Sequence, residues 1–504
     1  MLRRMPASPI PIRPGASGTP GTSGASEASE ASGAFPGDAC PGALRLHAAD
    51  DGYLARVRIP GGILDVAQAR ALGDAAARLG DGTLHLTSRG NVQLRGLREG
   101  CGGELAEVLG AAGLLPSAAH ERVRNVVASP MSGLDGGGVV DVRGWLTGLD
   151  AALCASSVTP ELSGRFLFAL DDGRGDVAGL RPDVLLRGLA GGSAGLFVGG
   201  AAFVVEYADA ARAAVIAAEV FVAAARGVSG RRVWRVRELN MPAPELASLI
   251  AEQLSARGIE ASPLSGAGGD GAVPIGIEAN PVRGAGNCAT SHDAPAPAID
   301  SATGTAAQAT GLRPGPRSSI AGGAEFYGPG DQPSAEAEIL GPGGQRPTEA
   351  EFYGPGGQPP AEAEFYGPGG QKITAPFGAF AQPQWAALTD LVARLPAREI
   401  RLTPWRDIVI PGATRAQADQ LTGTGLVADP DSPWTRTGAC TGRPGCAKAN
   451  ADVRADATAR HPTLPTYWSG CERRCGHPVG PYVDVVARPD GTYDVSNPTS
   501  TQPS

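Results

Sequence analysis

The chain lacks the features that would place it in a membrane or on nucleic acid. No apolar run reaches the roughly 18 residues that a membrane-spanning helix needs. No hydrophobic stretch follows the arginine pair near the start, so we expect no signal peptide. With 43 Lys and Arg against 51 Asp and Glu, the formal net charge is −8. Because the chain also has no long basic block, we do not expect it to bind nucleic acid non-specifically.

Cysteine is scarce, with eight in 504 residues. This content gives no disulfide framework, and it favours an intracellular, cytoplasmic location where thiols stay reduced. Glycine and proline are instead abundant, at 73 and 44 residues, a content typical of chains with extensive disorder. We expect a disordered tail at 1–39, a low-complexity insert at 264–371 and a second tail at 494–504.

The insert carries a tandem repeat with a period of 13 residues. In AEFYGPGDQP, AEILGPGGQRP, AEFYGPGGQPP and AEFYGPGGQK, the first glycines are Gly328, Gly341, Gly354 and Gly367. This period is too short for most solenoid units, and each copy places a turn-forming Gly-Pro-Gly beside a small hydrophobic element. The insert is therefore either a flexible spacer or an array that binds a partner.

A second, longer repeat relates two distant parts of the chain. Gly62 to Gly96 aligns without a gap on Gly378 to Gly412, at a constant offset of 316 residues. The absence of gaps makes a chance similarity of two Ala-rich segments a poor explanation. Identical residues recur at this offset, including Gln68/Gln384, Ala71/Ala387, Leu72/Leu388, Asp74/Asp390, Leu86/Leu402 and Thr87/Thr403.

Each copy predicts a strand, an amphipathic helix and two further short strands. In the first copy YLARVRI alternates toward Ile59, residues 66–79 have helical spacing, and LHLTS and VQLRGL are period-2 runs. One such unit cannot cover both of its faces, so we expect the two copies to pack about a pseudo-two-fold axis. Between them, 120–263 predicts mixed α/β structure, with strands in GRFLFALDD and AFVVEYAD and helices at 210–227 and 245–258.

Four cysteines near the end of the chain suggest a metal centre. Cys440 and Cys446 are separated by five residues, and Cys471 and Cys475 by three. Structural zinc usually takes tighter spacings, whereas four thiolates on Gly-rich turns suit a [4Fe–4S] cluster, which needs soft ligands and accepts backbone N–H bonds at its sulfides. We favour the cluster and keep zinc as the alternative. Three neighbouring arginines would offset part of the cluster's negative charge: Arg443, Arg473 and Arg474.

Three motifs resemble those of a known superfamily. The C-x5-C and C-x3-C pairs resemble the cluster motif of the sirohaem-dependent nitrite and sulfite reductases. LTSRGNVQLRGL (86–97) resembles the segment that closes their first ferredoxin-like half, and RNVVASPMSG (124–133) resembles their tetrapyrrole-site segment. The resemblance covers roughly 40–263 and 372–490.

Within that superfamily, three further segments are most similar to the precorrin-3B synthase family of aerobic cobalamin biosynthesis. They are CPGALRLHAADDGYLARVRIPGG (40–62), RLTPWRDIVI (401–410) and WSGCERRCGHP (468–478). Members of this family use O2 to hydroxylate precorrin-3A at C20, and the ring A acetate closes to a γ-lactone. NADH is the indirect reductant, and the family is associated with a non-haem iron besides its [4Fe–4S] cluster.

The resemblance implies an α+β fold of the nitrite/sulfite reductase type. Two ferredoxin-like half-repeats would be related by a pseudo-two-fold axis, and mixed α/β domains would carry the [4Fe–4S] cluster. The implied domains are a first half-repeat at 40–116, a tetrapyrrole-site domain at 117–263, a second half-repeat at 372–425 and an iron–sulfur domain at 426–493.

A tetrapyrrole with eight carboxylates calls for guanidinium groups in its site. Arg89 and Arg95 alternate on one predicted strand and would point to the same face, although exposed arginines on a solvated strand are the alternative. By similarity to the reductases, we expect Arg89 and Arg124 to contact carboxylates or substrate. Three amides would assist them: Asn91, Gln93 and Asn125.

Two departures from the reductases bear on the reaction. The reductases tend to place two lysines, one residue apart, around the anion site, whereas LSGRFLF has Arg165 and then Leu167. The second repeat copy has Trp405 where the first has Arg89. Six-electron reduction of a small anion needs concentrated positive charge, so both changes favour hydroxylation of a large tetrapyrrole. The alternatives are a ferredoxin-dependent sirohaem reductase and a zinc-stabilised scaffold whose 13-residue repeats recruit partners.

Other candidate motifs remain unassigned. GAGGDG at 266–271 has no flanking strand and helix and is no dinucleotide site, so we expect a separate electron-donor protein to act through the cluster. No histidine forms part of a facial-triad pattern, and the catalytic residues stay unknown; His477, beside the cluster cysteines, is the histidine to test. The remaining cysteines are expected to be plain buried or loop thiols: Cys40, Cys101, Cys154 and Cys288.

Overall fold

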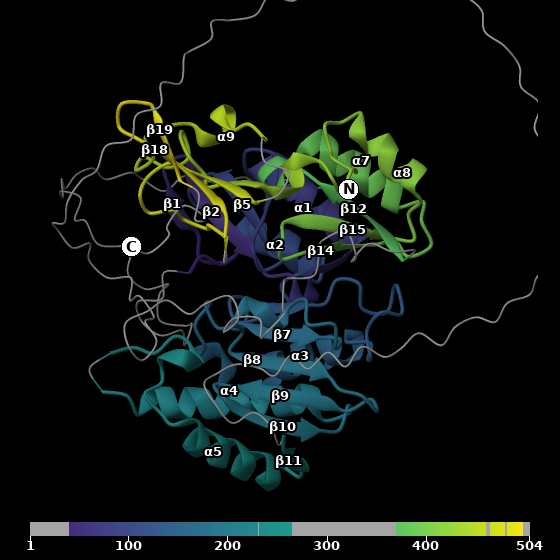
Figure 1. The fold of residues 1–504 in the computed structure, drawn as a ribbon, viewed down its shortest axis with the longest axis vertical. Helices are drawn as coiled ribbons and strands as arrows, with labels where there is room; N and C mark the ends of the chain where they lie inside the picture. The colour runs from purple at the N-terminus through teal and green to yellow at the C-terminus, as the bar shows by residue number, and fades with distance from the viewer. Residues whose placement is uncertain (1–39, 230, 265–368, 460–463, 479–480, 497–504) are drawn as a thin grey trace, which may run out of the picture. The chain divides into compact units, whose positions relative to one another are not determined.

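The computed structural model describes most of the chain outside its tails and insert (Figure 1). The predicted tail at 1–39 and all but the last residues of the 13-residue repeats lie outside the described residues. The predicted end of the insert at 371 is wrong, because strand β12 (Gly370–Thr374) already begins at Gly370. Strand β19 ends at Ser496, so the first three residues of the predicted tail at 494–504 belong to a strand. Every helix in the described ranges is too short or too polar to span a bilayer. The described ranges are 40–229, 231–264, 369–459, 464–478 and 481–496.

The first half-repeat is a five-stranded antiparallel sheet with two helices, which confirms the elements predicted there. Helix α1 (Val66–Leu79) begins with a capping box, in which the Asp65 side chain accepts the N–H of Gln68 at 2.8 Å and the Gln68 side chain accepts the N–H of Asp65 at 3.1 Å. The sheet order is β1-β2-β5-β4-β13. The other elements are β1 (His47–Ala49), β2 (Gly52–Val57), β4 (Thr83–Leu86), β5 (Val92–Leu97), β13 (Ala379–Ala381) and α2 (Gly102–Ala111).

The second half-repeat builds the same arrangement from the second copy. Its antiparallel sheet has the order β12-β15-β14-β3. Gln384 accepts the N–H of Ala381 at 2.9 Å, as Gln68 does for Asp65 in the first copy. The elements are β3 (Ile63–Asp65), β12 (Gly370–Thr374), β14 (Glu399–Leu402), β15 (Asp407–Pro411), α7 (Gln382–Val392) and α8 (Arg415–Thr422).

The two halves exchange one short strand each, which makes the pseudo-two-fold relation explicit. Asp65 of β3 pairs with Glu399 of β14, and Ala381 of β13 pairs with Thr83 of β4. These two pairings are equivalent under the 316-residue offset. Neither half-sheet is therefore complete without the other copy, and the two share one hydrophobic core.

The helices α1 and α7 pack together within that shared core. The Trp385 Nε1–H donates to the carbonyl oxygen of Ala69 at 2.7 Å. A side chain at Gly73 would place its Cβ 2.7 Å from Cδ1 of Trp385. The absence of a side chain at Gly73 thus lets the indole lie against α1, and the pair fixes how the two halves meet.

Between the halves, the chain forms a mixed six-stranded sheet, β11-β10-β9-β8-β7-β6, covered by helices. Strands β6, β7 and β8 are parallel and the rest antiparallel. The helices predicted at 210–227 and 245–258 are observed as α4 (Ala210–Arg226) and α5 (Ala243–Ala256). The remaining elements are α3 (Arg143–Ala155), β6 (Val126–Ala128), β7 (Phe168–Asp171), β8 (Val184–Gly188), β9 (Ala194–Val198), β10 (Ala201–Val205) and β11 (Ala261–Pro263).

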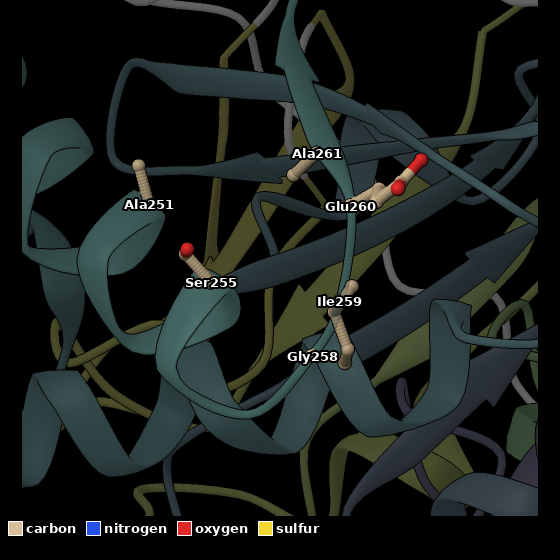
Figure 2. A pocket seen from close by; sticks show the side chains of 6 residues that line it. All are labelled: Ala251, Ser255, Gly258, Ile259, Glu260 and Ala261. Carbon is tan, nitrogen blue, oxygen red and sulfur yellow. The ribbon is translucent and has the colours of Figure 1, made fainter.

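A cavity of about 390 Å³ lies where α5 approaches β11 (Figure 2). Ser255 and Glu260 supply its polar side chains. None of the residues predicted to bind substrate or metal lines this cavity. It therefore lies outside the candidate site.

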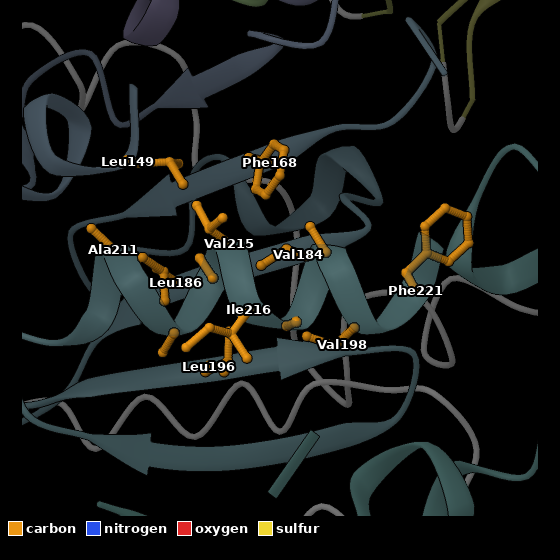
Figure 3. Packing of buried hydrophobic residues seen from close by; sticks show 14 of the residues in the cluster. Leu149, Phe168, Val184, Leu186, Leu196, Val198, Ala211, Val215, Ile216 and Phe221 are labelled. Carbon is orange, nitrogen blue, oxygen red and sulfur yellow. The ribbon is translucent and has the colours of Figure 1, made fainter. Parts of the chain in front are cut away.

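Helix α4 lies across the sheet and covers its central strands (Figure 3). Its alanine-rich sequence lets the helix backbone approach the sheet closely, so that it is buried on nearly all sides. This packing forms the main core of the middle domain and fixes the ends of β6 and β7, from which the candidate site is built. Facing residues include Phe168, Val184, Leu186, Leu196 and Val198 on the strands, and Ala211, Val215, Ile216 and Phe221 on α4.

The C-terminal domain is a four-stranded sheet of order β16-β17-β18-β19. Strands β16, β17 and β18 run parallel, and β19 closes the sheet antiparallel to β18. Parallel neighbours end at the same edge of a sheet, so the segments that follow β16 and β17 meet there. The elements are β16 (Thr437–Ala439), β17 (Thr466–Ser469), β18 (Val483–Ala487), β19 (Tyr493–Ser496) and the short helix α9 (Val453–Asp456).

Candidate active site

Three arginines of the first half-repeat lie near one another, and two of them donate to one carbonyl group. Arg56 and Arg58 lie two residues apart at the end of β2 and so face the same side. Arg89 lies in the turn between β4 and β5. The Gly164 oxygen accepts Arg58 Nη2–H at 3.2 Å and Arg89 Nη1–H at 3.5 Å. None of the three arginines, which we call the arginine cluster, forms an ion pair with another described residue.

The electrostatics of the arginine cluster favour an anion. Burial, followed by the charges of Arg56 and Arg89, lowers the pKa of Arg58 to about 9. Burial, followed by the charges of Arg235 and Arg56, lowers the pKa of Arg89 to about 10. Arg58 is 2% exposed, and its Nη1 has no hydrogen-bond partner. Because a buried cation without a carboxylate partner is costly, a carboxylate that binds here gains charge-assisted hydrogen bonds from the donor that the protein leaves without a partner.

Arg56 and Arg58 were not among the residues predicted to bind substrate. The signal was present in the alternation of YLARVRI, which puts both guanidinium groups on one face of β2. Gln93, which was predicted, stands opposite Arg56 in the β2–β5 register and accepts its Nη2–H at 3.1 Å. Gln93 thereby holds Arg56 in place at the sheet surface.

The two predicted asparagines join the middle domain to the first half-repeat. Asn91 accepts the N–H of Ile59 at 2.9 Å and donates to Asn125 Oδ1 at 2.9 Å. Asn125 in turn donates to the carbonyl oxygen of Phe166 at 2.9 Å. Both side chains are fully buried. This chain of amides positions the 124–133 segment and the Gly164 turn against the arginine cluster.

Arg95 and Arg124 already have carboxylate partners. Arg95 donates to Asp51 at 2.7 and 2.8 Å and to the carbonyl oxygen of Gly445 at 2.9 Å. Arg124 donates to Asp150 at 2.6 and 2.8 Å. Their exposures are 6% and 5%, whereas Arg89 is half-buried. The structure thus brings Arg89, but neither of these two, into the arginine cluster, and their predicted contacts with substrate stay predictions.

Arg165 is exposed and follows the glycine that the arginine cluster contacts. Leu167, two residues further, is 2% exposed and packs against Val127 and Leu185. The position two residues after Arg165 therefore belongs to the hydrophobic core. In the described LSGRFLF segment, Arg165 is therefore the single exposed cation.

The four predicted metal ligands come from two adjacent loops of the C-terminal domain. Cys440 directly follows β16, and the loop with Cys471 and Cys475 directly follows β17. The Gly470 N–H donates to Cys440 Sγ at 3.1 Å. In the intervening loop, the Gly445 oxygen that accepts from Arg95 lies beside Cys446. The thiols are therefore held at the edge where the parallel strands end.

The arrangement fits an iron–sulfur cluster better than a zinc ion. Burial, then the charges of Cys471, Cys440 and Cys446, raises the pKa of the Cys475 thiol. Among the described side chains, no three cysteine sulfurs lie within 4.8 Å of one another. Tetrahedral zinc would need its sulfurs about 3.8 Å apart, whereas a four-iron cube separates its outer thiolates further. The hydrogen bond from the Gly470 amide to Cys440 Sγ is also typical of cluster ligands.

The cations near these thiols include the predicted Arg473, whose charge opposes the rise in the pKa of Cys475, and one arginine that was not predicted. Arg474 pairs with Asp484 and Glu472, both at 2.6 Å, so part of its charge is already offset. Arg454, which the sequence did not single out, is largely buried and donates to the Cys440 oxygen at 3.1 Å and to His85 Nδ1 at 3.2 Å. His477 is exposed and stacks on Tyr482. Arg454 thus links the cysteine loops to the first half-repeat.

These features define a class: two exchanged ferredoxin-like halves, a cationic sheet surface and a four-cysteine centre. A sequence profile of the nitrite/sulfite reductase ferredoxin-like half domain matches residues 47–112. The solved structure of the Mycobacterium tuberculosis NirA protein has the same fold, with a TM-score of 0.55 at 17% identity, over 88% of this chain and 73% of that one. Over this half domain the chain is similar to the nitrite/sulfite reductases.

Curated relatives include two kinds of enzyme. The chain is 33% identical to a precorrin-3B synthase of Sinorhizobium sp over 135 residues, which is 27% of this chain and 28% of that protein. It is 37% identical to a ferredoxin–nitrite reductase of Synechococcus elongatus over 128 residues, 24% of this chain and 25% of that protein. The matches thus span about a quarter of each relative. They support the predicted resemblance and show that the chain is related to oxidoreductases.

Proposed function

We propose that the chain hydroxylates precorrin-3A at C20 with O2, with closure of the ring A acetate to a γ-lactone, as precorrin-3B synthases do in aerobic cobalamin biosynthesis. The observation that carries this proposal is the arginine cluster. Its unpaired donors suit the carboxylates of a free tetrapyrrole. The similarity to a precorrin-3B synthase supports the choice of substrate.

The segment after Gly164 supports hydroxylation over reduction of a small anion. The reductases of the superfamily tend to carry two lysines there, and this chain has an exposed Arg165 and a buried Leu167. Trp405 replaces the arginine of the first copy at the equivalent turn of the second. A large apolar macrocycle gains from an aromatic surface, whereas a small oxyanion gains from a second cation.

The chain's own residues bind and orient the substrate in this proposal. Arg56 and Arg89 would hold peripheral carboxylates, while the Asn91–Asn125 pair keeps the Gly164 turn in position. When bound, the [4Fe–4S] cluster would supply single electrons that originate from NADH and arrive through a donor protein. Two electrons and two protons balance the reaction, since one atom of O2 enters the substrate and the other leaves as water.

A mononuclear iron has no assigned place in this proposal. Among the described side chains, the only group of three possible ligands within 4.8 Å consists of aspartates and contains no histidine. A facial triad of two histidines and one carboxylate therefore does not fit the described residues, and no step is routed through such an iron. We also propose a cytoplasmic location, because the cluster and thiols need a reducing compartment.

The test is the absorption spectrum of protein purified without oxygen, followed by acid–acetone extraction of pigment. The proposal predicts a broad iron–sulfur absorption with no extractable sirohaem. Sirohaem in proportion to protein would reject it, and a colourless protein that retains zinc would reject the cluster as well.

The second candidate is a ferredoxin-dependent nitrite or sulfite reductase that binds sirohaem. It is favoured by the 37% identity to the Synechococcus ferredoxin–nitrite reductase. In this case the arginine cluster would hold the carboxylates of the prosthetic group instead of a substrate. The same extraction separates the two candidates.

A further inference from the structure

Three aspartates meet at the end of β7 in the middle domain, outside the arginine cluster and the cysteine loops. Asp171 is the last residue of β7, and Asp172 and Asp176 lie in the loop that follows. One carboxylate oxygen of each lies within 4.8 Å of those of the other two. All three side chains are buried, with exposures of 0%, 0% and 9%. We call them the aspartate triplet.

Two members of the triplet have protein partners. Asp171 accepts the N–H groups of Gly173 and Gly175, both at 2.9 Å. Asp172 accepts from Arg174 at 2.9 Å, and Arg174 also donates to Asp135. These contacts satisfy oxygens of both carboxylates within the loop.

Asp176 is different, because half of its carboxylate has no partner. Its Oδ1 accepts the hydroxyl of Ser129 at 2.6 Å. Its Oδ2 is buried and has no hydrogen-bond partner, and one oxygen of its carboxylate lies within 4.8 Å of an oxygen of Asp171 and of Asp172. Burial, followed by the charge of Asp171, raises the pKa of Asp176. An unpaired carboxylate oxygen this deeply buried needs either a proton or a cation.

The charges around the triplet do not balance. With all four carboxylates ionised, they would exceed the two nearby guanidinium groups by two negative charges. Burial raises the pKa of Asp171 and of Asp176, so the fully ionised state needs a further cation. One divalent cation would neutralise this surplus and give Asp176 Oδ2 a partner. The groups are Asp135, Asp171, Asp172 and Asp176 against Arg174 and Arg187, the last at 4.0 Å from Asp171.

We propose that the aspartate triplet binds one divalent cation of the hard, oxygen-preferring class, with Mg2+ or Mn2+ as the representative ions. Carboxylate oxygens without thiols or imidazoles select this class over zinc and copper. The remaining coordination positions would be filled by water. The proposal does not depend on which reaction the chain catalyses.

The position of the site indicates what the cation does. Ser129, which contacts both Asp176 and the N–H of Asp172, lies in the 124–133 segment. Arg401 of the second half-repeat donates to the carbonyl oxygens of Pro130 and Ser132 in the same segment, at 2.8 and 2.7 Å. A cation at the triplet would therefore fix the middle of this segment to the end of β7 while Arg401 fixes it to the second half. It would act as a structural clamp.

The experiment is an anaerobic titration of the full chain, with its cluster intact, using Mn2+ alone and measuring free Mn2+ by electron paramagnetic resonance. We expect one Mn2+ per chain, displaced by excess Mg2+. Asp176→Asn keeps the shape of the side chain and its bond to Ser129, and it should weaken binding by about 10-fold or more because one ligand charge is lost. Asp390→Asn, an exposed carboxylate paired with Arg70, is the matched control and should bind like the wild type.

Two results would overturn the proposal. One is a wild type that takes up no Mn2+, which would mean that a shared proton satisfies Asp176 instead. The other is Asp176→Asn protein that binds Mn2+ as the wild type does. If this variant fails to fold, the wild type alone decides, because its thermal unfolding midpoint must rise with added Mn2+ for the proposal to stand.

Discussion

At the residue scale, the arginine cluster has a physical cost that points to its role. Burying one guanidinium group without a carboxylate is unfavourable, and placing Arg56, Arg58 and Arg89 near one another adds mutual repulsion. Elsewhere in the described chain, buried arginines such as Arg95 and Arg124 have ion-pair partners. A ligand that carries carboxylates would remove the repulsion and should therefore stabilise the folded protein.

Arg89→Gln should raise the dissociation constant for precorrin-3A by about 10- to 100-fold. A charge-assisted hydrogen bond contributes roughly 1.5–3 kcal/mol, which converts to that range. The measurement is an absorbance titration without oxygen. Arg70→Gln, an exposed arginine of α1 that pairs with Asp390, is the control and should leave binding unchanged. Equal affinity of Arg89→Gln and wild type would remove Arg89 from the binding site.

His85 should make stability depend on pH below neutrality. Burial lowers the pKa of His85 from 6.5; its hydrogen bond to Asp81 opposes this shift and the charge of Arg454 adds to it. Because Arg454 can only donate, the bond to His85 Nδ1 requires a neutral ring. The folded state therefore resists protonation, so the stability contributed by His85 is complete above pH 6.5 and is lost as the pH falls toward its folded pKa.

The variant His85→Gln removes this contribution. Between about pH 6.5 and 5, the unfolding free energy of the wild type should fall more steeply than that of the variant, by up to ~1.4 kcal/mol per pH unit. The thermal unfolding midpoint, measured across this pH range, should show the same difference. His47→Gln, at an exposed position, is the control and should follow the wild type. Parallel pH profiles for His85→Gln and wild type would contradict the assignment.

At the scale of elements, the two half-repeats share the same backbone conformation at turns where their residues differ. Gly61, Gly82 and Gly90 have φ angles of 63°, 81° and 64°. The equivalent residues of the second copy, which are not glycines, also have positive φ, between 48° and 69°. Left-handed conformations are unfavourable for residues with a Cβ, so the second copy retains a conformation that its sequence disfavours. The equivalent residues are Phe377, Arg398 and Arg406.

Matched substitutions in the two copies should have opposite effects. Gly82→Ala should destabilise the protein by about 1 kcal/mol, since the added Cβ meets no atom within 4 Å and only the positive φ opposes it. Arg398→Gly should stabilise it by up to about 1 kcal/mol, less the loss of its bond to the Ala393 oxygen. Thermal unfolding tests both. Shifts of the same sign would show that the two turns are not equivalent.

Much of this fold could be predicted from local patterns. The capped helix at 66–79 and the strands at both of its ends follow from helical and period-2 spacing, and the gapless repeat predicted the pseudo-two-fold pairing. The exchange of β3 and β13 could not be predicted, because a three-residue strand has too little pattern and its partner lies in the other copy. The role of Arg454 could not be predicted for a similar reason, because its contact with His85 joins residues far apart in the sequence. Its other contact is with the Cys440 oxygen.

At the scale of the whole described structure, equivalent residues on the sheets of the two halves make different contacts. In the first half, Arg56 and Gln93 stand in register beside the open arginine cluster. In the second half, the equivalent Lys372 pairs with Asp407, and Arg401 holds the 124–133 segment. In the proposed function, one copy would therefore bind the ligand, and the other copy would support the binding site. The sequence spacing indicated the cysteines as candidate ligands, but only the folded chain shows which arginines already pair with carboxylates.

Cys440→Ser should abolish the [4Fe–4S] cluster, because a serine hydroxyl ionises far less readily than a thiol and its oxygen is a harder ligand than sulfur. Iron and sulfide content per chain, measured on protein purified without oxygen, tests this outcome. Cys154→Ser, at a cysteine of α3 outside the cysteine loops, is the matched control and should keep the wild-type content. Full iron and sulfide content in Cys440→Ser would reject the ligand assignment.

The most direct test of the proposed function is turnover. Reduced protein with its cluster intact should be incubated with precorrin-3A and isotopically heavy O2, and the product analysed by mass spectrometry. Hydroxylation by O2 predicts a product that has gained one heavy oxygen atom, formed only when O2 and reductant are both present. Unchanged precorrin-3A, together with reduction of nitrite or sulfite by the same protein, would contradict the proposal and establish the reductase.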